Sequence, residues 1–167
     1  MNDLQIQKIG PEDSLWNIFL KLSADYFLEI WPESFTGKSL PSLMHDYDQQ
    51  LRKRIAEGGR YLFLLKREED ILGFANVYLN SSLIPNTKQR VLTLNIAEFA
   101  ILPAWRRKGL GTYFLQSLVD FGKKKGAERV SAEVDLKNEA ALKFWGLYFS
   151  DYVRVDSRIV FWKILIL

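Results

Sequence analysis

A short basic segment with two glycines separates a strand-like apolar run from an amphipathic helical run, and it constrains the fold most. The strand-like run spans residues 95–102 and is closed by Pro103. The segment after it, called here the basic loop, contains Arg106, Arg107, Lys108, Gly109, Leu110 and Gly111. Glycine has no Cβ, so backbone N–H groups near Gly109 and Gly111 can approach an anion closely. Because the first N–H groups of a helix lack intrahelical partners, this order of elements predicts a phosphate site.

Two common phosphate-binding patterns do not fit the basic loop. A nucleoside-triphosphate loop requires a lysine directly after its second glycine, whereas Gly111 is followed by Thr112. A dinucleotide-binding loop requires a third glycine at the position of Phe114. The loop does match the pattern [QR]-x-x-G-x-[GA] through Arg106, Gly109 and Gly111. We interpret it as the binding loop for the diphosphate of a coenzyme.

A second pattern follows the next strand-like run, residues 129–135. It has the form N-x-x-A-x-x-F-[YW], with Asn138, Ala141 and Phe144 at the first fixed positions and Trp145 at the last. Asparagine is a good N-cap, alanine permits close approach, and the two aromatic residues supply an apolar wall. An ordinary capped amphipathic helix would show the same residue types, so the pattern gains its weight from its position after the basic loop.

In their order and spacing, the two patterns resemble the GCN5-related N-acetyltransferase (GNAT) family. The loop of that family binds the pyrophosphate of acetyl-CoA, and its second pattern opens the helix beside the pantetheine arm. Residues 97–152 carry most of the resemblance. It implies an α/β (α+β) acyl-CoA N-acyltransferase fold with a mixed central sheet of about seven strands and about four flanking helices. A single N-acetyltransferase domain would then span residues 1–167.

Residue patterning along the chain gives the same order of elements, βααβββαβαββ. The expected strands are 4–9, 61–66, 71–79, 91–102, 129–135, 151–156 and 158–166. The expected helices run from Trp16 through Phe27 with Asp13 or Ser14 as N-cap, over 41–56, from Leu110 past Phe121, and over 138–149. Residues 80–89 are predicted to form a loop.

The composition excludes several kinds of protein and site. Of the 167 residues, 48% are hydrophobic and 14% aromatic, which is enough for one globular domain. The absence of cysteine excludes disulfides, thiolate metal sites and a cysteine acyl-enzyme. His45 is the only histidine, and we expect it at the surface and no bound metal. Without a signal peptide or an apolar run long enough to span a membrane, the chain is expected to be cytoplasmic.

The net charge of +3 does not favour nucleic acid as a partner. Basic residues gather at 106–108 and 123–125. The second cluster suits the C-terminus of a helix, where the dipole favours cations, so it needs no polyanionic ligand. The apolar end of the chain, residues 164–167, could pair across a homodimer.

The resemblance also implies which residues bind the coenzyme. In the family, a bulge in the strand before the loop frees backbone groups for the thioester and the pantetheine. By position, this bulge falls on Phe99, Ala100 and Ile101. The diphosphate would lie against the six residues of the basic loop. The remaining members of the implied set are Thr112, Asn138, Ala141 and Phe144.

Glu98 is the main candidate for a catalytic side chain, because it interrupts the apolar run 96–101. Acetyl transfer requires a neutral amine, and a carboxylate beside the acceptor could remove the proton directly or through water. In related enzymes an acidic residue at this position often faces the amine. The alternative is a carboxylate that faces solvent or pairs with a base on a neighbouring strand. Asn95 is a weaker polar candidate.

The group that protonates the departing thiolate is less clearly indicated. The family often uses a tyrosine directly after the phenylalanine of the second pattern, but this position is Trp145, whose indole N–H has no useful acidity. Tyr148, one helical turn further on, could replace it, and a packing role is the alternative. Water would also suffice, since a simple thiol has a pKa of about 8.5.

The acceptor side is expected near residues 26–33, which include Tyr26, Phe27, Glu29 and Trp31. The corresponding region of the family covers the acceptor, and aromatic rings with carboxylates suit a cationic amine. An amphipathic helix that packs on the sheet is the alternative. We therefore expect an acetyl-CoA-dependent N-acetyltransferase that acts on a primary amine of a small molecule or a protein, by direct transfer in a ternary complex. The alternative is a CoA-binding sensor or scaffold without catalysis.

Overall fold

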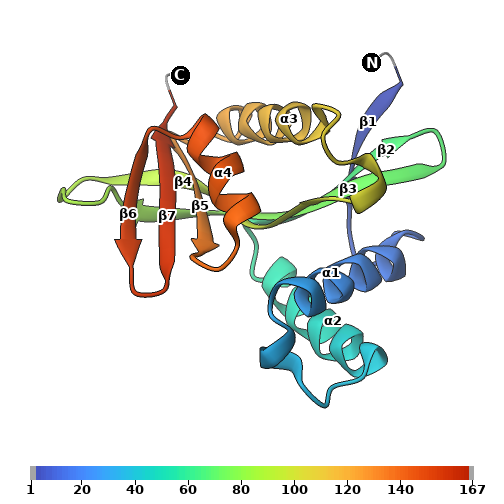
Figure 1. Ribbon diagram of the computed structural model, residues 1–167. Coiled ribbons are helices and arrows are strands. Elements are labelled where there is room, and N and C mark those ends of the chain that lie inside the picture. The colour runs from blue at the N-terminus through green and yellow to red at the C-terminus, as the bar shows by residue number, and fades with distance from the viewer. Residues whose placement is uncertain (1–2, 166–167) are drawn as a thin grey trace. The chain divides into compact units, whose positions relative to one another are not determined.

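The computed structural model describes residues 3–165 and has the predicted order of strands and helices (Figure 1). Its strands are β1 (Leu4–Ile9), β2 (Arg60–Arg67), β3 (Asp70–Leu83), β4 (Arg90–Ile101), β5 (Arg129–Asp135), β6 (Asp151–Val155) and β7 (Arg158–Ile164). Its helices are α1 (Trp16–Ile30), α2 (Leu40–Ala56), α3 (Leu110–Lys124) and α4 (Glu139–Tyr148), with the 3₁₀ turns η1 (Pro32–Phe35) and η2 (Pro103–Trp105). The sheet has the order β1-β2-β3-β4-β5-β7-β6. This mixed seven-stranded sheet with its helices confirms the predicted fold class.

The chain divides into two compact units, which are described separately. The first unit comprises Met1–Asn76 and Glu98–Gly111, and the second comprises Val77–Ala97 and Thr112–Leu167. Strands β3 and β4 contribute residues to both units. That one domain spans residues 1–167 stays a prediction.

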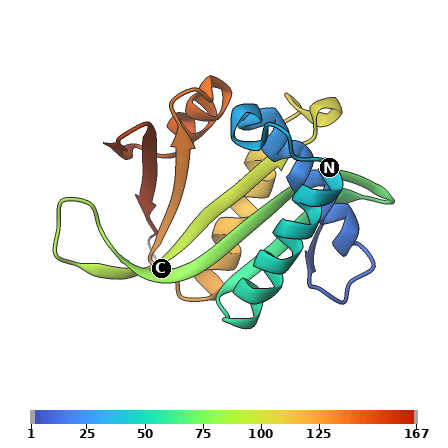
Figure 2. The same cartoon turned by 90° about the horizontal axis from the view of Figure 1, so that it is seen from below.

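The core of the first unit forms where α1 and α2 meet the first strands. The two helices lie side by side (Figures 1 and 2). Apolar residues recur at helical spacing on α1, so Trp16, Phe19 and Leu20 all turn to the same side and are buried. The other buried members of this cluster are Ile9, Tyr47, Leu51, Leu62, Leu64 and Phe74. Strand β1 pairs with β2 in antiparallel register, from Leu4 opposite Arg67 to Ile9 opposite Leu62.

The predicted N-cap of α1 is wrong. The cap position is Leu15, which makes no side-chain capping bond. Asp13 lies two residues before Leu15 and accepts the Leu15 N–H on its Oδ1 at 2.9 Å. Helix α2 follows the usual rule, since Ser39 at its N-cap accepts the N–H of Ser42.

In the second unit, β5 joins β4 to the C-terminal hairpin. It pairs in parallel with β4 over Thr93–Ile96 and along its whole length in antiparallel with β7, which also pairs with β6. Figure 1 shows β6 and β7 as this hairpin, beside α4. Helix α3 buries Phe114 and Leu118, as its amphipathic pattern predicted. At Gly122 a Cβ would lie 2.8 Å from the side chain of Leu94, so glycine permits the close packing of α3 on β4.

Strand β3 is longer than predicted, since it continues to Leu83 through part of the expected loop. The reason is Arg129 of β5, which is only 5% exposed. Its guanidinium donates to the Leu83 carbonyl at 2.8 Å, to the Ser82 hydroxyl at 2.7 Å and to the Thr93 hydroxyl at 3.1 Å. These bonds hold the end of β3 in place. Burial lowers the pKa of Arg129.

The predicted terminal strand is confirmed as β7 up to Ile164. Its last expected residue, Ile166, and Leu167 lie outside the described residues, so the homodimer expected at 164–167 stays a prediction. Over residues 3–165, none of the helices combines the length and the apolarity needed to cross a membrane.

Candidate active site

The end of β4 directs its backbone groups alternately to two sides. The Ala100 carbonyl oxygen faces β3, because a Cβ added at Gly73 would lie 2.5 Å from it. Leu102 donates its N–H to the Leu72 carbonyl of β3 at 2.8 Å. Since successive residues of a strand alternate, the backbone groups of Phe99 and Ile101 point away from β3. The β4–β5 ladder itself covers Thr93–Ile96 and does not include them.

The basic loop turns sharply before α3 begins at Leu110. Arg107 and Gly109 both have left-handed backbones, with φ of 64° and 77°. Such a conformation costs little for glycine and more for arginine, so the loop carries some strain at Arg107. A Cβ at Gly109 would meet no atom within 4 Å. The space beside this backbone is therefore open, as the approach of an anion requires.

The three basic side chains of the loop differ in their partners. Arg106 donates from Nε to the Ile101 carbonyl at 2.8 Å, and its Nη atoms lie 3.3 Å from the Glu29 carboxylate of α1. Lys108 donates to the Ala104 carbonyl at 3.2 Å and lies over the Trp105 ring. Arg107 is exposed and makes no side-chain hydrogen bond within residues 3–165. Arg107 is thus the side chain best placed to pair with an added anion.

Glu98 does not face solvent freely, and within residues 3–165 it forms no ion pair with a base on a neighbouring strand. Its Oε2 accepts the hydroxyl of Tyr47 from α2 at 2.9 Å. The residue is partly exposed, but its carboxyl group is surrounded by protein. This desolvation raises the pKa of Glu98, and the bond from Tyr47, the positive charge of Arg60 and the amide of Asn76 oppose the rise. A carboxylate whose pKa is raised is a stronger base than an ordinary glutamate, so it is better suited to accept a proton.

The raised pKa of Glu98 predicts a pH-dependent effect on stability. The folded state holds this proton more tightly than the unfolded chain, so the Glu98 contribution to stability falls as pH rises from the unfolded pKa through the folded one. A Glu98→Gln variant avoids this loss. We expect it to melt at a higher temperature than the parent at about pH 8, with the difference vanishing near about pH 4. Equal differences in melting temperature at both pH values would contradict this expectation.

Aromatic side chains of α1 lie in the same region. Tyr26 packs edge-on against Phe74, and Phe27 packs edge-on against Tyr47 with ring centroids 4.9 Å apart. Burial, and then the negative charges of Glu98 and Glu29, raise the pKa of Tyr26 to about 12. The segment predicted to line the acceptor side therefore lies close to Glu98 within the first unit. It also packs against the core, as the alternative expected, and its role on the acceptor side stays a prediction.

In the second unit, α4 has the predicted start. Asn138 is the N-cap, and its Oδ1 accepts the N–H of Ala141 at 3.1 Å. Trp145 is 5% exposed and stacks on Phe149, which agrees with a packing role. Phe144 packs against the rings of Trp145 and Tyr148.

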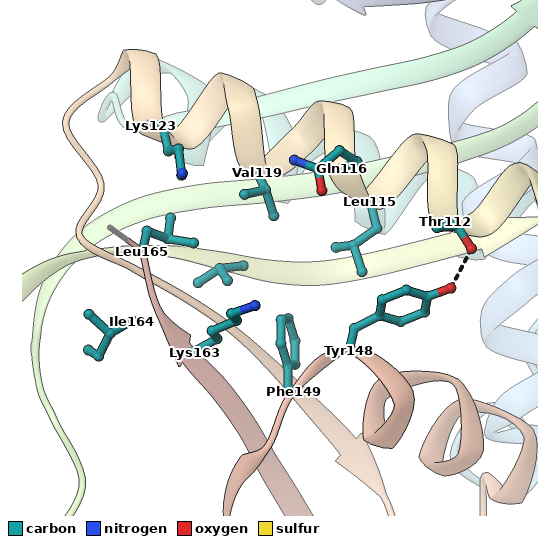
Figure 3. A pocket seen from close by; sticks show the side chains of 11 residues that line it. Thr112, Leu115, Gln116, Val119, Lys123, Tyr148, Phe149, Lys163, Ile164 and Leu165 are labelled. Atoms are coloured by element: carbon teal, nitrogen blue, oxygen red, sulfur yellow. Dashed lines mark hydrogen bonds between the residues drawn. The ribbon is translucent and has the colours of Figure 1, made fainter. Parts of the chain in front are cut away.

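The hydroxyl of Tyr148 forms a hydrogen bond with the hydroxyl of Thr112 in the first turn of α3 (Figure 3). Both residues line a hollow of about 290 Å³ between α3, the end of α4 and β7. Lys123 of α3 and Lys163 of β7 extend toward this hollow. Tyr148 is thus held beside Thr112 of α3 within the second unit.

Some candidates have other roles, and some contributors to the site were missed. Asn95 accepts from Ser131 and donates to Asn80, so it links neighbouring strands. His45 is exposed, as predicted, and contacts Gln49. The missed residues are Arg60, Asn76 and Tyr47, which lead by hydrogen bonds to Glu98. Asn76 interrupts an apolar strand sequence and Arg60 directly precedes one, and these positions were the sequence signals available for them.

Comparison with solved structures identifies the same fold in several acetyltransferases. The PaiA N-acetyltransferase of Thermoplasma acidophilum, solved with coenzyme A, has a TM-score of 0.71 at 13% identity and covers 97% of this chain and 99% of its own. The aminoglycoside N-acetyltransferase AAC(6')-Iy, solved with CoA, has a TM-score of 0.65 at 15% identity and covers 91% of each chain. An acetyltransferase of Thermus thermophilus has a TM-score of 0.64 at 23% identity and covers 97% of each.

A sequence search among curated proteins found no significant match. The model of one protein family, described as the acetyltransferase (GNAT) family, matches residues 18–147. This span contains β4, the basic loop and most of α4. It covers well over half of the chain and so confirms the family that the two sequence patterns suggested. The chain belongs to the acetyltransferase (GNAT) family.

Proposed function

We propose that this acetyltransferase moves the acetyl group of acetyl-CoA to a primary amine by direct transfer within a ternary complex. The observation that carries the proposal is that three features follow one another along the chain in the first unit. Glu98 has a raised pKa, the backbone of 99–101 follows it directly, and the open basic loop comes next. A protein that only binds CoA has no need of a desolvated carboxyl at this point.

The basic loop is proposed to bind the diphosphate. The backbone at Gly109 and Gly111 permits close approach, and the N–H groups at the start of α3, including those of Leu110 and Thr112, have no intrahelical partners. Arg107 supplies a positive charge, and Arg106 and Lys108 raise the local potential. The crystallised relatives named above with coenzyme A support this choice of co-substrate.

The acetyl and pantetheine groups are proposed to use backbone and apolar contacts. The backbone groups of Phe99 and Ile101 point away from β3, and their N–H groups would donate to the pantetheine and the thioester carbonyl. Ala100 would contribute through its small side chain, because its carbonyl faces β3. From α4, the family resemblance assigns the pantetheine contacts to Asn138, Ala141 and Phe144.

The chemical step balances with three proton transfers. Glu98 takes a proton from the ammonium form of the acceptor, and the neutral nitrogen then attacks the thioester carbon. A C–N bond forms, the C–S bond breaks, and the thiolate of CoA leaves with the electron pair. The nitrogen, now positively charged, loses its second proton to water as the amide forms, and this proton replaces the one that the thiolate receives. Tyr148 is the proposed source of the proton for the thiolate, and water is the alternative. If Tyr148 serves, Thr112 must be the donor in the bond between the two hydroxyls.

The acceptor is proposed to be a cationic primary amine of a small molecule or a protein. Tyr26 and Phe27 offer aromatic faces, and the negative charges of Glu98 and Glu29 favour an ammonium group. One structural relative is by name an aminoglycoside N-acetyltransferase, so aminoglycosides belong among the acceptors to be tested. Since the chain has no cysteine, it is suited to a reducing compartment, and we propose the cytoplasm.

An acetyl-CoA turnover screen tests the function. The protein is incubated with acetyl-CoA and a panel of aminoglycosides, polyamines, amino acids and peptides, and release of free thiol is followed. We expect release that depends on at least one amine, with the acetylated amine identified by mass spectrometry. Intact-mass analysis without acceptor should show no turnover-competent acetyl-enzyme. Tight CoA binding without turnover on the whole panel would instead favour the sensor or scaffold.

A further inference from the structure

A chain of hydrogen bonds crosses the first unit and ends on Glu98. The Arg60 guanidinium donates to Oδ1 of Asn76 at 2.7 Å. Nδ2 of Asn76 donates to the Tyr47 hydroxyl at 3.0 Å, and that hydroxyl donates to Oε2 of Glu98 at 2.9 Å. The four residues come from β2, β3, α2 and β4. Asn76 is fully buried and Tyr47 is 7% exposed, so water does not replace these bonds easily.

The direction of every proton in this chain is fixed by its first member. A guanidinium can only donate, so the Asn76 atom facing Arg60 must be the carbonyl oxygen. The amide nitrogen therefore faces Tyr47 and donates to it. Since the Tyr47 hydroxyl already accepts this bond, its single proton is directed to Glu98. Glu98 must then accept, which favours its ionised form.

We propose that Tyr47 is a positioning residue for the reaction, which fixes the Glu98 carboxylate and keeps it ionised so that it can accept the proton of the amine. The proposal rests on the proposed function of Glu98 as the base. Tyr47 suits the task because it remains protonated, since burial and the Glu98 charge raise its pKa well above the usual value. Its ring is held by Phe27, so the hydroxyl has little freedom to turn elsewhere.

Several charged or titratable groups act on Glu98 from the surrounding elements. From α1, Tyr26 interacts with the negative charge of Glu98, which raises the pKa of Tyr26. From α2, Tyr47 donates directly and the positive charge of Arg54 has a weaker effect. From β2, Arg60 lowers the pKa of Glu98 through its charge. Tyr47 is the tyrosine that donates to the carboxylate, so its removal should change the titration more than removal of Tyr26.

A Tyr47→Phe variant tests the proposal through the pH profile of kcat/KM. The acid limb of this profile, where activity rises with pH, reports the pKa of the base. The carboxylate loses a charge-assisted donor, so the limb should move upward by about one to two pH units. Activity should then recover partly at pH values above the shifted limb, while KM for acetyl-CoA stays within about twofold. Tyr152→Phe is the control, because it removes the hydroxyl of an exposed tyrosine on β6 that has no part in the proposed site, and its acid limb should stay in place. An unshifted limb in Tyr47→Phe would overturn the proposal.

A direct titration separates this proposal from the proposed function. Carbon-13 NMR of the glutamate carboxyl groups gives the pKa of Glu98, with Glu98→Gln used to assign the signal. The signal should titrate at higher pH in Tyr47→Phe than in the parent, whether or not any amine is acetylated. If no amine reacts, the proposed function is wrong. If the Glu98 titration is the same in Tyr47→Phe and in the parent, the positioning role of Tyr47 is wrong.

Tyr47→Phe leaves Asn76 without a buried acceptor, and this loss could prevent folding. A second variant, expected to shift the pKa of Glu98 in the opposite direction, covers that case. Incorporation of 3-fluorotyrosine at position 47 keeps the shape and makes the phenol a stronger donor. The pKa of Glu98 and the acid limb should then both move downward. A move upward, or no move in a folded and active protein, would contradict the positioning role.

Discussion

Replacement of Gly111 by aspartate is expected to abolish binding of acetyl-CoA. Gly111 is the second residue of α3 and the last of the basic loop. A carboxylate there would lie against the diphosphate that the loop is proposed to bind. At an effective dielectric constant of about 20, two like charges about 4 Å apart cost about 4 kcal/mol, so affinity should fall by at least about 10²-fold. Isothermal titration calorimetry with acetyl-CoA measures this loss.

Two further variants separate the effect of the added negative charge on binding from the effect of side-chain size and from a general effect of adding an aspartate. Gly111→Asn has nearly the same size as aspartate without its charge, and should weaken binding less. Gly10→Asp is a suitable control, because a Cβ at Gly10 meets no atom within 4 Å. It should keep the parental dissociation constant. A folded Gly111→Asp protein that binds acetyl-CoA with parental affinity would show that the diphosphate lies elsewhere.

Glu98→Gln is expected to lower kcat/KM for the amine by roughly 10²- to 10⁴-fold, the usual effect of losing a general base. Glutamine keeps the shape, and its Oε1 can still accept the bond from Tyr47. The affinity for acetyl-CoA should remain nearly intact, since a carboxylate would repel the phosphates if it faced them. The loss should shrink at high pH, where more of the amine is already neutral.

The control for this variant is Glu69→Gln, which removes an exposed carboxylate in the turn between β2 and β3. It should retain the parental pH profile. If Glu98→Gln acetylates a confirmed acceptor at the parental rate across the pH range, Glu98 is structural and the proton leaves by another route. Glu98→Gln is also expected to raise the melting temperature at about pH 8. If it loses activity while it gains stability, Glu98 is a residue that lowers stability in exchange for activity.

The sequence was sufficient for the features that depend on neighbouring residues. Alternating and helical apolar patterns placed the strands and helices in their correct order, because burial of one face imposes these periods. The start of α4 at Asn138 followed from capping chemistry within three residues. The family was identified from two local patterns, and the family match over residues 18–147 confirms it.

Some local rules failed where distant residues intervened. Residues 80–83 have the polar composition of a loop, yet they form strand because Arg129, 46 positions from Leu83, holds them in place. The sequence did not distinguish the three charged side chains of the basic loop. The fold distinguishes them, because Glu29 lies 77 positions before Arg106 and pairs with it.

The surroundings of Glu98 could be decided only by the tertiary structure. Its charge and its place in an apolar strand were visible in the sequence, but its partner Tyr47 is 51 positions away on α2. Neither residue follows a periodic rule that points to the other, and the bond exists because α2 packs beside the strands in the core of the first unit. The sequence therefore determined which elements form and which family they build. The packing of those elements decided which carboxylate loses water, which donors it gains and hence how readily it accepts a proton.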